Sequence, residues 1–189
     1  MGFMDEIGGG GTKLLKFDGK AGQYVARGSD ASFNNQEFDA NHYAAKAGYI
    51  GFGEKGEKPE RRMGSVFPKD EAPDRASLGD TDKTKWPAGR FGDGPQDPWT
   101  PVIEIPLQHR ATGEDFLFTA SSKTALAAAK DFLAQCRKVP EGFLPTVRLG
   151  VGSFKSRFGD VKKPVLHIVG KAPIEGGDDP NHFNDELLF

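Results

Sequence analysis

Only one segment of this chain has the apolar spacing of an amphipathic helix. Its stripe consists of Leu126, Ala129, Leu133 and Cys136, at intervals of three and four residues. Ser121 or Ser122 can cap the start and Pro140 must follow the end, so we expect one helix at about 121–138. A single helix is too small to bury one whole face of a large sheet whose other face is exposed to solvent. The sheet must therefore close on itself or pack on a second sheet.

Strands are expected in most of the remaining chain. Glycine and proline, with 25 and 13 residues, are too frequent for a helix-rich protein and point to strands joined by turns. Alternating apolar residues around Asp18-Gly19 and Thr112-Gly113 predict two hairpins. The expected strands lie at 14–17, 23–27, 49–53, 61–67, 101–109, 115–120, 144–160 and 162–171. This pattern favours a mainly β fold, an OB-like Greek-key antiparallel barrel with additional strands, and a β-sandwich is the alternative.

One domain with appendages is expected from the length of 189 residues. Residues 1–11 form a glycine-closed arm, residues 12–174 the OB-like domain, and residues 175–189 an acidic tail expected to be disordered. Residues 68–98 form a Pro/Gly-rich loop without apolar periodicity. Because a wholly disordered segment would rarely keep tryptophans, Trp86 and Trp99 indicate that part of this loop packs.

Charge is divided unevenly between the body and the tail. The formal net charge is −2, and the tail holds five acids, so residues 1–174 carry +3. A mildly cationic body is compatible with a nucleic-acid partner when its basic residues lie on one face. Cys136 is the only cysteine, there is no secretory signal pattern, and no run of 18 apolar residues occurs. We therefore expect a cytoplasmic protein without a membrane segment.

Several motifs suggest catalysis or cofactor binding but lack its structural context. Gly51, Gly53 and Gly56 have dinucleotide-site spacing, yet no helical stripe follows them. The four histidines are far apart and no pair has metal-ligand spacing. The acids Asp80, Asp82, Asp93 and Asp97 lie in the Pro-rich loop, where solvated turn acids are the simpler interpretation. We expect no enzyme activity, no cofactor and no metal, and a metal-dependent nuclease using Asp80 and Asp82 is the enzymatic alternative.

Aromatic and basic residues recur together on the expected strands. Single-stranded nucleic acid is held by this combination, because bases stack on flat rings and cations follow the phosphates. Alternation from Val147 to Phe158 directs Phe154 and Phe158 to one side of the strand and Lys155 to the other. The predicted nucleic-acid-binding residues are Lys20, Tyr24, Arg27, Phe52, Arg61, Arg62, Arg148, Phe154, Lys155, Arg157 and Phe158, with Lys162 and Lys163 beside them.

The tail completes a recognisable layout. Its predicted partner-binding residues are Asp178, Asp179, Asp185, Glu186, Leu187, Leu188 and Phe189. A basic, aromatic β body followed by an acidic arm that ends in Phe resembles the single-stranded-DNA-binding proteins of bacteria and their phages. The resemblance implies that the arm recruits replication and repair proteins and competes with DNA for the basic groove. The ending "NDELLF" differs from the Ile-Pro-Phe ending of the bacterial tip.

A second resemblance covers much of residues 78–170. The stretches "LGDTDKTKWP", "DPW" and "FTASSKTALAAAKDFL" are similar to phage-borne proteins of unassigned role in recombination gene clusters. The leading hypothesis is a non-sequence-specific single-stranded-DNA-binding protein of phage or plasmid replication or recombination. A phage structural or protein-interaction module without nucleic-acid binding is the alternative. The sequence also leaves a homo-oligomer open.

Overall fold

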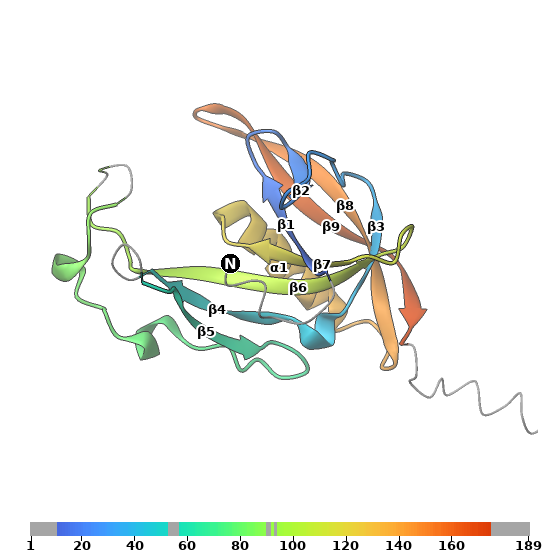
Figure 1. Cartoon of the computed structure of the whole chain (residues 1–189), viewed down its shortest axis with the longest axis horizontal. Helices are drawn as coiled ribbons and strands as arrows, with labels where there is room; N and C mark the ends of the chain where they lie inside the picture. Colours follow the sequence, from blue (N-terminus) through green and yellow to red (C-terminus); the bar gives the residue numbers. More distant parts are fainter. Residues whose placement is uncertain (1–10, 53–56, 90–91, 93, 175–189) are drawn as a thin grey trace, which may run out of the picture.

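One mixed β-sheet and one α-helix make up the body of the protein (Figure 1). The computed structural model describes residues 11–52, 57–89, 92 and 94–174. The strands in these residues are β1 (Lys13–Asp18), β2 (Gln23–Ala26), β3 (Glu37–Ala40), β4 (Lys46–Gly51), β5 (Glu60–Ser65), β6 (Trp99–His109), β7 (Asp115–Ala120), β8 (Phe143–Ser156) and β9 (Gly159–Pro173). The helix α1 spans Lys123–Cys136. The predicted arm, apart from Gly11, and the predicted tail at 175–189 lie outside the described residues.

The sheet is open, and this corrects the expected closed antiparallel barrel. Its main path runs β2-β1-β7-β6-β3-β8-β9, and β4 branches from β6 and carries β5. Strand β1 pairs with β7 in parallel, so the sheet is mixed. Among the described residues no strand pairing joins the end strands β2 and β9, and a barrel requires such a closing ladder. The mainly β composition with one helix agrees with the prediction.

Most local elements form where their patterns predict them. The two predicted hairpins are β1–β2 and β6–β7, and the two long strands after the helix are β8 and β9. Helix α1 begins after Ser122, whose hydroxyl accepts a hydrogen bond from the Ala125 amide at 3.3 Å. Strand β3 was not predicted, because its four residues lie in a polar stretch, yet it pairs with both β6 and β8.

The hydrophobic core lies between one face of the sheet and α1. The fully buried aromatic side chains are Tyr24, Phe38, Phe116, Phe118 and Phe132. Cys136 is buried in the same cluster, as predicted for a residue of the helical stripe, and burial raises the pKa of its thiol to about 12. The core therefore contains several aromatic side chains that strand alternation alone could not assign to the interior or to the surface.

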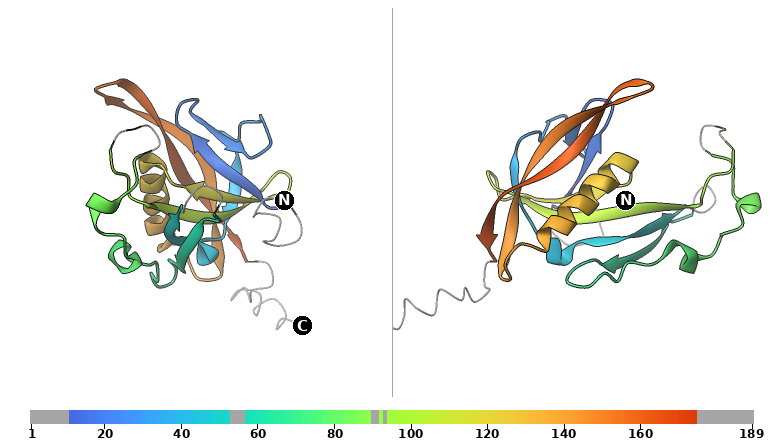
Figure 2. Two further views of the ribbon diagram at one scale, coloured as in Figure 1. Left: turned by 60° about the vertical axis from the view of Figure 1, so that its left-hand side comes forward. Right: turned by 180° about the vertical axis from the view of Figure 1, so that it is seen from behind.

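The first hairpin and the last hairpin lie side by side (Figure 2). In the turn between β1 and β2, Gly22 has a φ of +67°, and a Cβ there would lie 3.1 Å from the Lys162 side chain. The Tyr24 hydroxyl of β2 reaches both β8 and β9. The two ends of the open sheet are thus joined by side-chain contacts without a backbone ladder.

Candidate nucleic-acid interface

The β8–β9 hairpin extends beyond the core at its turn end, where it projects from the rest of the sheet (Figure 2). Its backbone pairing continues from Val151 opposite Pro164 to Ser156 opposite Gly159. Val151 is 37% exposed because the strand has left the core at this point. Phe154 is 41% exposed and Phe158 is 84% exposed. This projecting segment, residues 151–164, is called the hairpin arm below.

The pairing register distributes side chains over the two faces of the hairpin arm. Phe154 lies opposite Val161, with Lys163 two pairs further from the turn on the same face. Lys155 lies on the other face, opposite Asp160, with Lys162 as its neighbour on that face. The arm therefore presents cationic side chains on both faces, with the ring of Phe154 on one of them.

The turn of the hairpin arm displays an aromatic ring. The Ser156 hydroxyl accepts a hydrogen bond from the Phe158 amide at 3.1 Å and donates one to the Gly159 carbonyl at 3.0 Å. Gly159 has a φ of +109°, which a side chain would strain. The Arg157 guanidinium lies 4.6 Å from the centre of the Phe158 ring. A local hydrogen-bond network thus holds a cation and an exposed ring together at the tip.

Positive charge is concentrated in the C-terminal part of the described chain. Residues 121–174 contain ten Lys and Arg against three Asp and Glu, whereas residues 11–120 contain fifteen against seventeen. The arm itself carries four cations, Lys155, Arg157, Lys162 and Lys163, and one acid, Asp160. Within the part of the chain that the structure describes, none of these four cations has an ion-pair partner. The arm is therefore a surface of uncompensated positive charge.

A groove of about 500 Å³ continues from the arm between α1 and β9. Ala127 and Val165 contribute apolar surface, and the ring of Phe154 lines the groove as well. Lys123 and Lys163 also line it, from opposite elements. Lys123 was not predicted as a binding residue, and its one local peculiarity in the sequence is a position in the first turn of α1, where the helix dipole disfavours a cation.

Tyr24 requires a correction. It was predicted to stack on a base, but its side chain is fully buried among core aromatics, 5.0 Å from Phe17 and 6.1 Å from Phe118 between ring centroids. The alternation of residues predicted the strand correctly, but it did not predict which face of the strand is buried in the core. Burial also raises the pKa of Tyr24, so the hydroxyl keeps its proton. Tyr24 therefore joins β2 to β8 and β9 and has no exposed ring surface on which a base could stack.

Three predicted arginines have carboxylate partners elsewhere on the sheet. Arg148 donates to Glu37 at 2.8 Å. Arg61 and Arg62 pair with Glu104 and Glu60 on the β4–β5 side of the sheet. The positive charge of these three arginines is thus paired with carboxylates, whereas the prediction assigned it to nucleic-acid binding.

The remaining predicted residues are exposed but not all near the arm. Phe52 is 60% exposed and follows β4, on the separate branch of the sheet in Figure 1. Arg27 lies at the end of β2 and lines a different groove. Lys20 is exposed in the β1–β2 turn, the turn that contacts Lys162 through Gly22. The structure thus groups Phe154, Lys155, Arg157 and Phe158 on the arm, with Lys20 in the adjoining turn.

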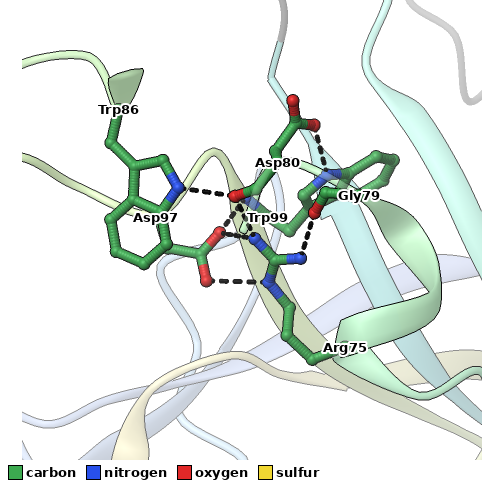
Figure 3. A network of polar contacts seen from close by, with 6 residues as sticks. All are labelled: Arg75, Gly79, Asp80, Trp86, Asp97 and Trp99. Atoms are coloured by element: carbon green, nitrogen blue, oxygen red, sulfur yellow. Dashed lines mark hydrogen bonds and ion pairs between the residues drawn. The ribbon is translucent and has the colours of Figure 1, made fainter. Parts of the chain in front are cut away.

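The acids of the 68–98 loop serve its own structure. Arg75 binds Asp97 through two hydrogen bonds of 2.7 and 2.8 Å and donates to the Gly79 and Asp80 carbonyls (Figure 3). The Asp80 carboxylate accepts from the Trp99 indole at 3.0 Å, and the Asp80 carbonyl accepts from the Trp86 indole at 2.6 Å. Trp99 is buried, which agrees with the expectation that part of the loop packs.

The described carboxylates that a metal site in this loop would need are already engaged in hydrogen bonds within the loop. Asp82 caps a short 3₁₀ turn by accepting from the Thr84 amide and hydroxyl at 3.0 and 2.6 Å. Asp93, Gly53 and Gly56, named above as motif residues, lie outside the described residues. In the described ranges no group of three or more His, Cys, Asp or Glu side chains is placed to hold a metal ion.

Two observations concern the whole described chain. Its helices include none with the length and apolar character needed to cross a membrane. Comparison with protein-family models, curated protein sequences and solved structures finds no match to this chain. The arm and the groove beside it are therefore the features from which a function can be inferred.

Proposed function

We propose that this protein binds single-stranded DNA without sequence specificity, through the hairpin arm and the α1–β9 groove. The observation that carries the proposal is the exposure of Phe154 and Phe158 beside four cations that have no ion-pair partner among the described residues. Exposed rings cost free energy in water, and a surface that keeps two of them next to uncompensated charge favours a ligand that is both flat and anionic.

Each part of the arm has a role in this binding. A base stacked on Phe158 or Phe154 contributes roughly 1–3 kcal/mol. Lys155, Lys162 and Lys163 bind phosphates on either side, and Arg157 holds the Phe158 ring in its exposed position. Any base has a face that can stack, so this interface needs no contacts to base edges and is sequence-tolerant.

The C-terminal residues 175–189 are proposed to act on the same surface. Their five acids would compete with DNA for the basic arm, because tethering gives them a high effective concentration. DNA would displace them and free Leu187, Leu188 and Phe189 for replication or recombination proteins. The proposal places the protein in the cytoplasm of a phage- or plasmid-bearing cell and assigns it no catalytic step.

The proposal also includes an OB-like fold for the body of the protein. It is supported by the contacts that join the sheet ends, at Tyr24 and at Gly22 beside Lys162, and by the single helix packed against the end strand β9. The missing ladder between β2 and β9 separates this body from a closed barrel.

Fluorescence anisotropy of a labelled oligo(dT) strand tests the proposal directly. We expect binding at low salt that weakens steeply as salt rises, and tighter binding once residues 175–189 are removed. A mixed-sequence strand of equal length should bind within a few fold of oligo(dT). No anisotropy change at low salt, with either the full chain or the truncated one, would refute DNA binding and favour the interaction-module alternative.

A further inference from the structure

A second groove, unrelated to the hairpin arm, crosses the sheet face opposite the core. It has a volume of about 600 Å³. Leu14 of β1 lies beside Leu117 of β7, and Leu117 lies beside Pro106 of β6 in the antiparallel pair. The Asn41 amide, just after β3, donates to the Pro106 carbonyl at 2.9 Å, and Leu144 of β8 completes the lining. This row of side chains is called the outer-face groove.

The outer-face groove is lined by apolar side chains, although the outer face of an open sheet is normally polar and exposed to solvent. Leu14, Leu117, Pro106 and Leu144 are only half-buried, although they occupy the middle of the sheet. Residues of the next row, Asp39 and Gln108, are polar, and Asp39 is already bound by Arg110 at 3.3 Å and by Thr146 at 2.8 Å. An apolar strip bounded by satisfied polar groups is typical of a surface that another segment covers.

We propose that residues 1–7 of this same chain dock in the outer-face groove. The chain enters the described structure at Gly11 and Thr12, and Thr12 and Lys13 line one end of the groove. The five strands β1, β7, β6, β3 and β8 span roughly 19 Å at a spacing of about 4.8 Å. Seven extended residues reach about 23 Å, which is enough to cross them. Gly8–Gly11 can adopt the turn that redirects the chain onto the sheet.

The composition of residues 1–7 matches the groove. Phe3, Met4 and Ile7 supply apolar side chains for the row of Leu14, Leu117 and Leu144. Asp5 and Glu6 are the only charged side chains of the segment. Arg27 lines the groove and Lys16 follows Leu14 by two residues on the same face of β1. Neither cation has an ion pair within the described ranges, so both can accept an acidic partner.

The C-terminal segment is the competing occupant, and the charge and geometry favour residues 1–7. Residues 175–189 carry five acids, and the polar row beside the groove already contains Asp39 and Asp115. Residues 1–7 bring two acids and connect directly to the strand that lines the groove.

Cysteine accessibility provides the test. The native Cys136 thiol is buried, so a cysteine introduced by Leu117→Cys is the reactive one. We expect its alkylation by iodoacetamide to accelerate about tenfold or more when residues 1–10 are deleted, or when Phe3, Met4 and Ile7 are all changed to Ser in the full chain. Ser153→Cys on the hairpin arm is the matched control, and its rate should not change. Leu144→Cys lies at the far end of the row, and its alkylation rate gives the same comparison if Leu117→Cys fails to fold.

Three outcomes would overturn the proposal. The first is an equal Leu117→Cys rate with and without residues 1–10. The second is acceleration only on removal of residues 175–189, which would assign the groove to the C-terminal segment. The third is protection that increases with protein concentration together with a dimer mass in light scattering, which would assign it to a second copy. None of these measurements involves DNA, so the result is independent of the proposed function.

Discussion

The Tyr24 hydroxyl donates a hydrogen bond to the Gly150 carbonyl at 2.8 Å and accepts one from the Val165 amide at 3.1 Å. Gly150 and Val165 are opposite each other in the β8–β9 pairing. One buried side chain of the end strand β2 therefore holds both strands at the other end of the sheet. Through this contact the core sets the position from which the hairpin arm projects.

Tyr24→Phe should destabilise the protein while leaving the core packing in place. The ring stays buried, but the Gly150 carbonyl and the Val165 amide lose a partner, which costs roughly 1–3 kcal/mol of the free energy of unfolding. Urea denaturation followed by circular dichroism measures the change. Tyr43→Phe is the control, because the Tyr43 hydroxyl makes no hydrogen bond to other described residues. Equal stability of the two variants would show that the Tyr24 bridge contributes nothing.

Phe154→Ala and Phe158→Ala should each weaken oligo(dT) binding by about 5- to 100-fold, the equivalent of one lost stacking interaction. Phe52→Ala removes a similarly exposed ring from the β4 end and should leave affinity unchanged. Anisotropy titrations at one salt concentration give the comparison. An equal loss in all three variants would place the interface outside the arm or indicate a general effect on folding.

The double change Lys162→Gln and Lys163→Gln should reduce the slope of log K against log salt by about 1.4, because each phosphate contact on a single strand contributes about 0.7. Arg62→Gln is the control for removal of a single cation away from the arm, since Arg62 pairs with Glu60 and lies on β5, and it should leave the slope unchanged. Affinities measured at four or more salt concentrations give both slopes. A parallel decrease in affinity without a change of slope would argue against phosphate contacts by these lysines.

Arg75→Met should loosen the 68–98 loop without unfolding the core. Asp97 and the Gly79 and Asp80 carbonyls lose the guanidinium as a donor, while Asp97 keeps the Trp99 amide and the Asp80 carbonyl keeps the Trp86 indole. Arg75 is not a member of the core cluster. We expect faster tryptic cleavage at Lys83 and Lys85 and red-shifted tryptophan emission, with an unchanged midpoint for the core by circular dichroism. Arg75 holds the pKa of Asp97 below its usual range, so in the unmodified protein the same loosening should begin as pH falls below about 4. Unchanged cleavage would mean that other contacts order the loop.

His42→Leu should make stability less dependent on pH. The His42 side chain is fully buried, and its two ring nitrogens have no hydrogen bond of ordinary geometry to the described residues. Burial lowers the pKa of His42, and a weaker backbone interaction with Ala40 opposes this shift in part. The unfolded chain therefore binds a proton that the folded protein excludes, and the free energy of unfolding falls as pH drops below about 6.5. The variant should lose up to about 1.4 kcal/mol per pH unit of that slope in urea titrations between pH 5 and 6.5. An identical slope in both proteins would assign the acid sensitivity to other groups.

Local patterns in the sequence were sufficient for the elements whose signals are short-range. The helical stripe ending at Cys136, the β6–β7 hairpin and the long β8–β9 pair all formed within a few residues of their predicted bounds. Turn chemistry and side-chain period are properties of neighbouring residues, so they can be interpreted without knowing the fold. The alternation that separates Phe154 from Lys155 belongs to the same class.

The tertiary structure alone decided which strands meet and which face becomes the interior. Nothing in the segment Glu37–Ala40 predicts that it lies between β6 and β8, and nothing near Lys13 predicts its parallel pairing with β7. Tyr24 and Phe158 are both aromatic residues near basic ones in the sequence, yet the first is fully buried and the second 84% exposed. The difference arises because burial depends on contacts between distant segments, and a period of two specifies that two faces differ but not which one is covered.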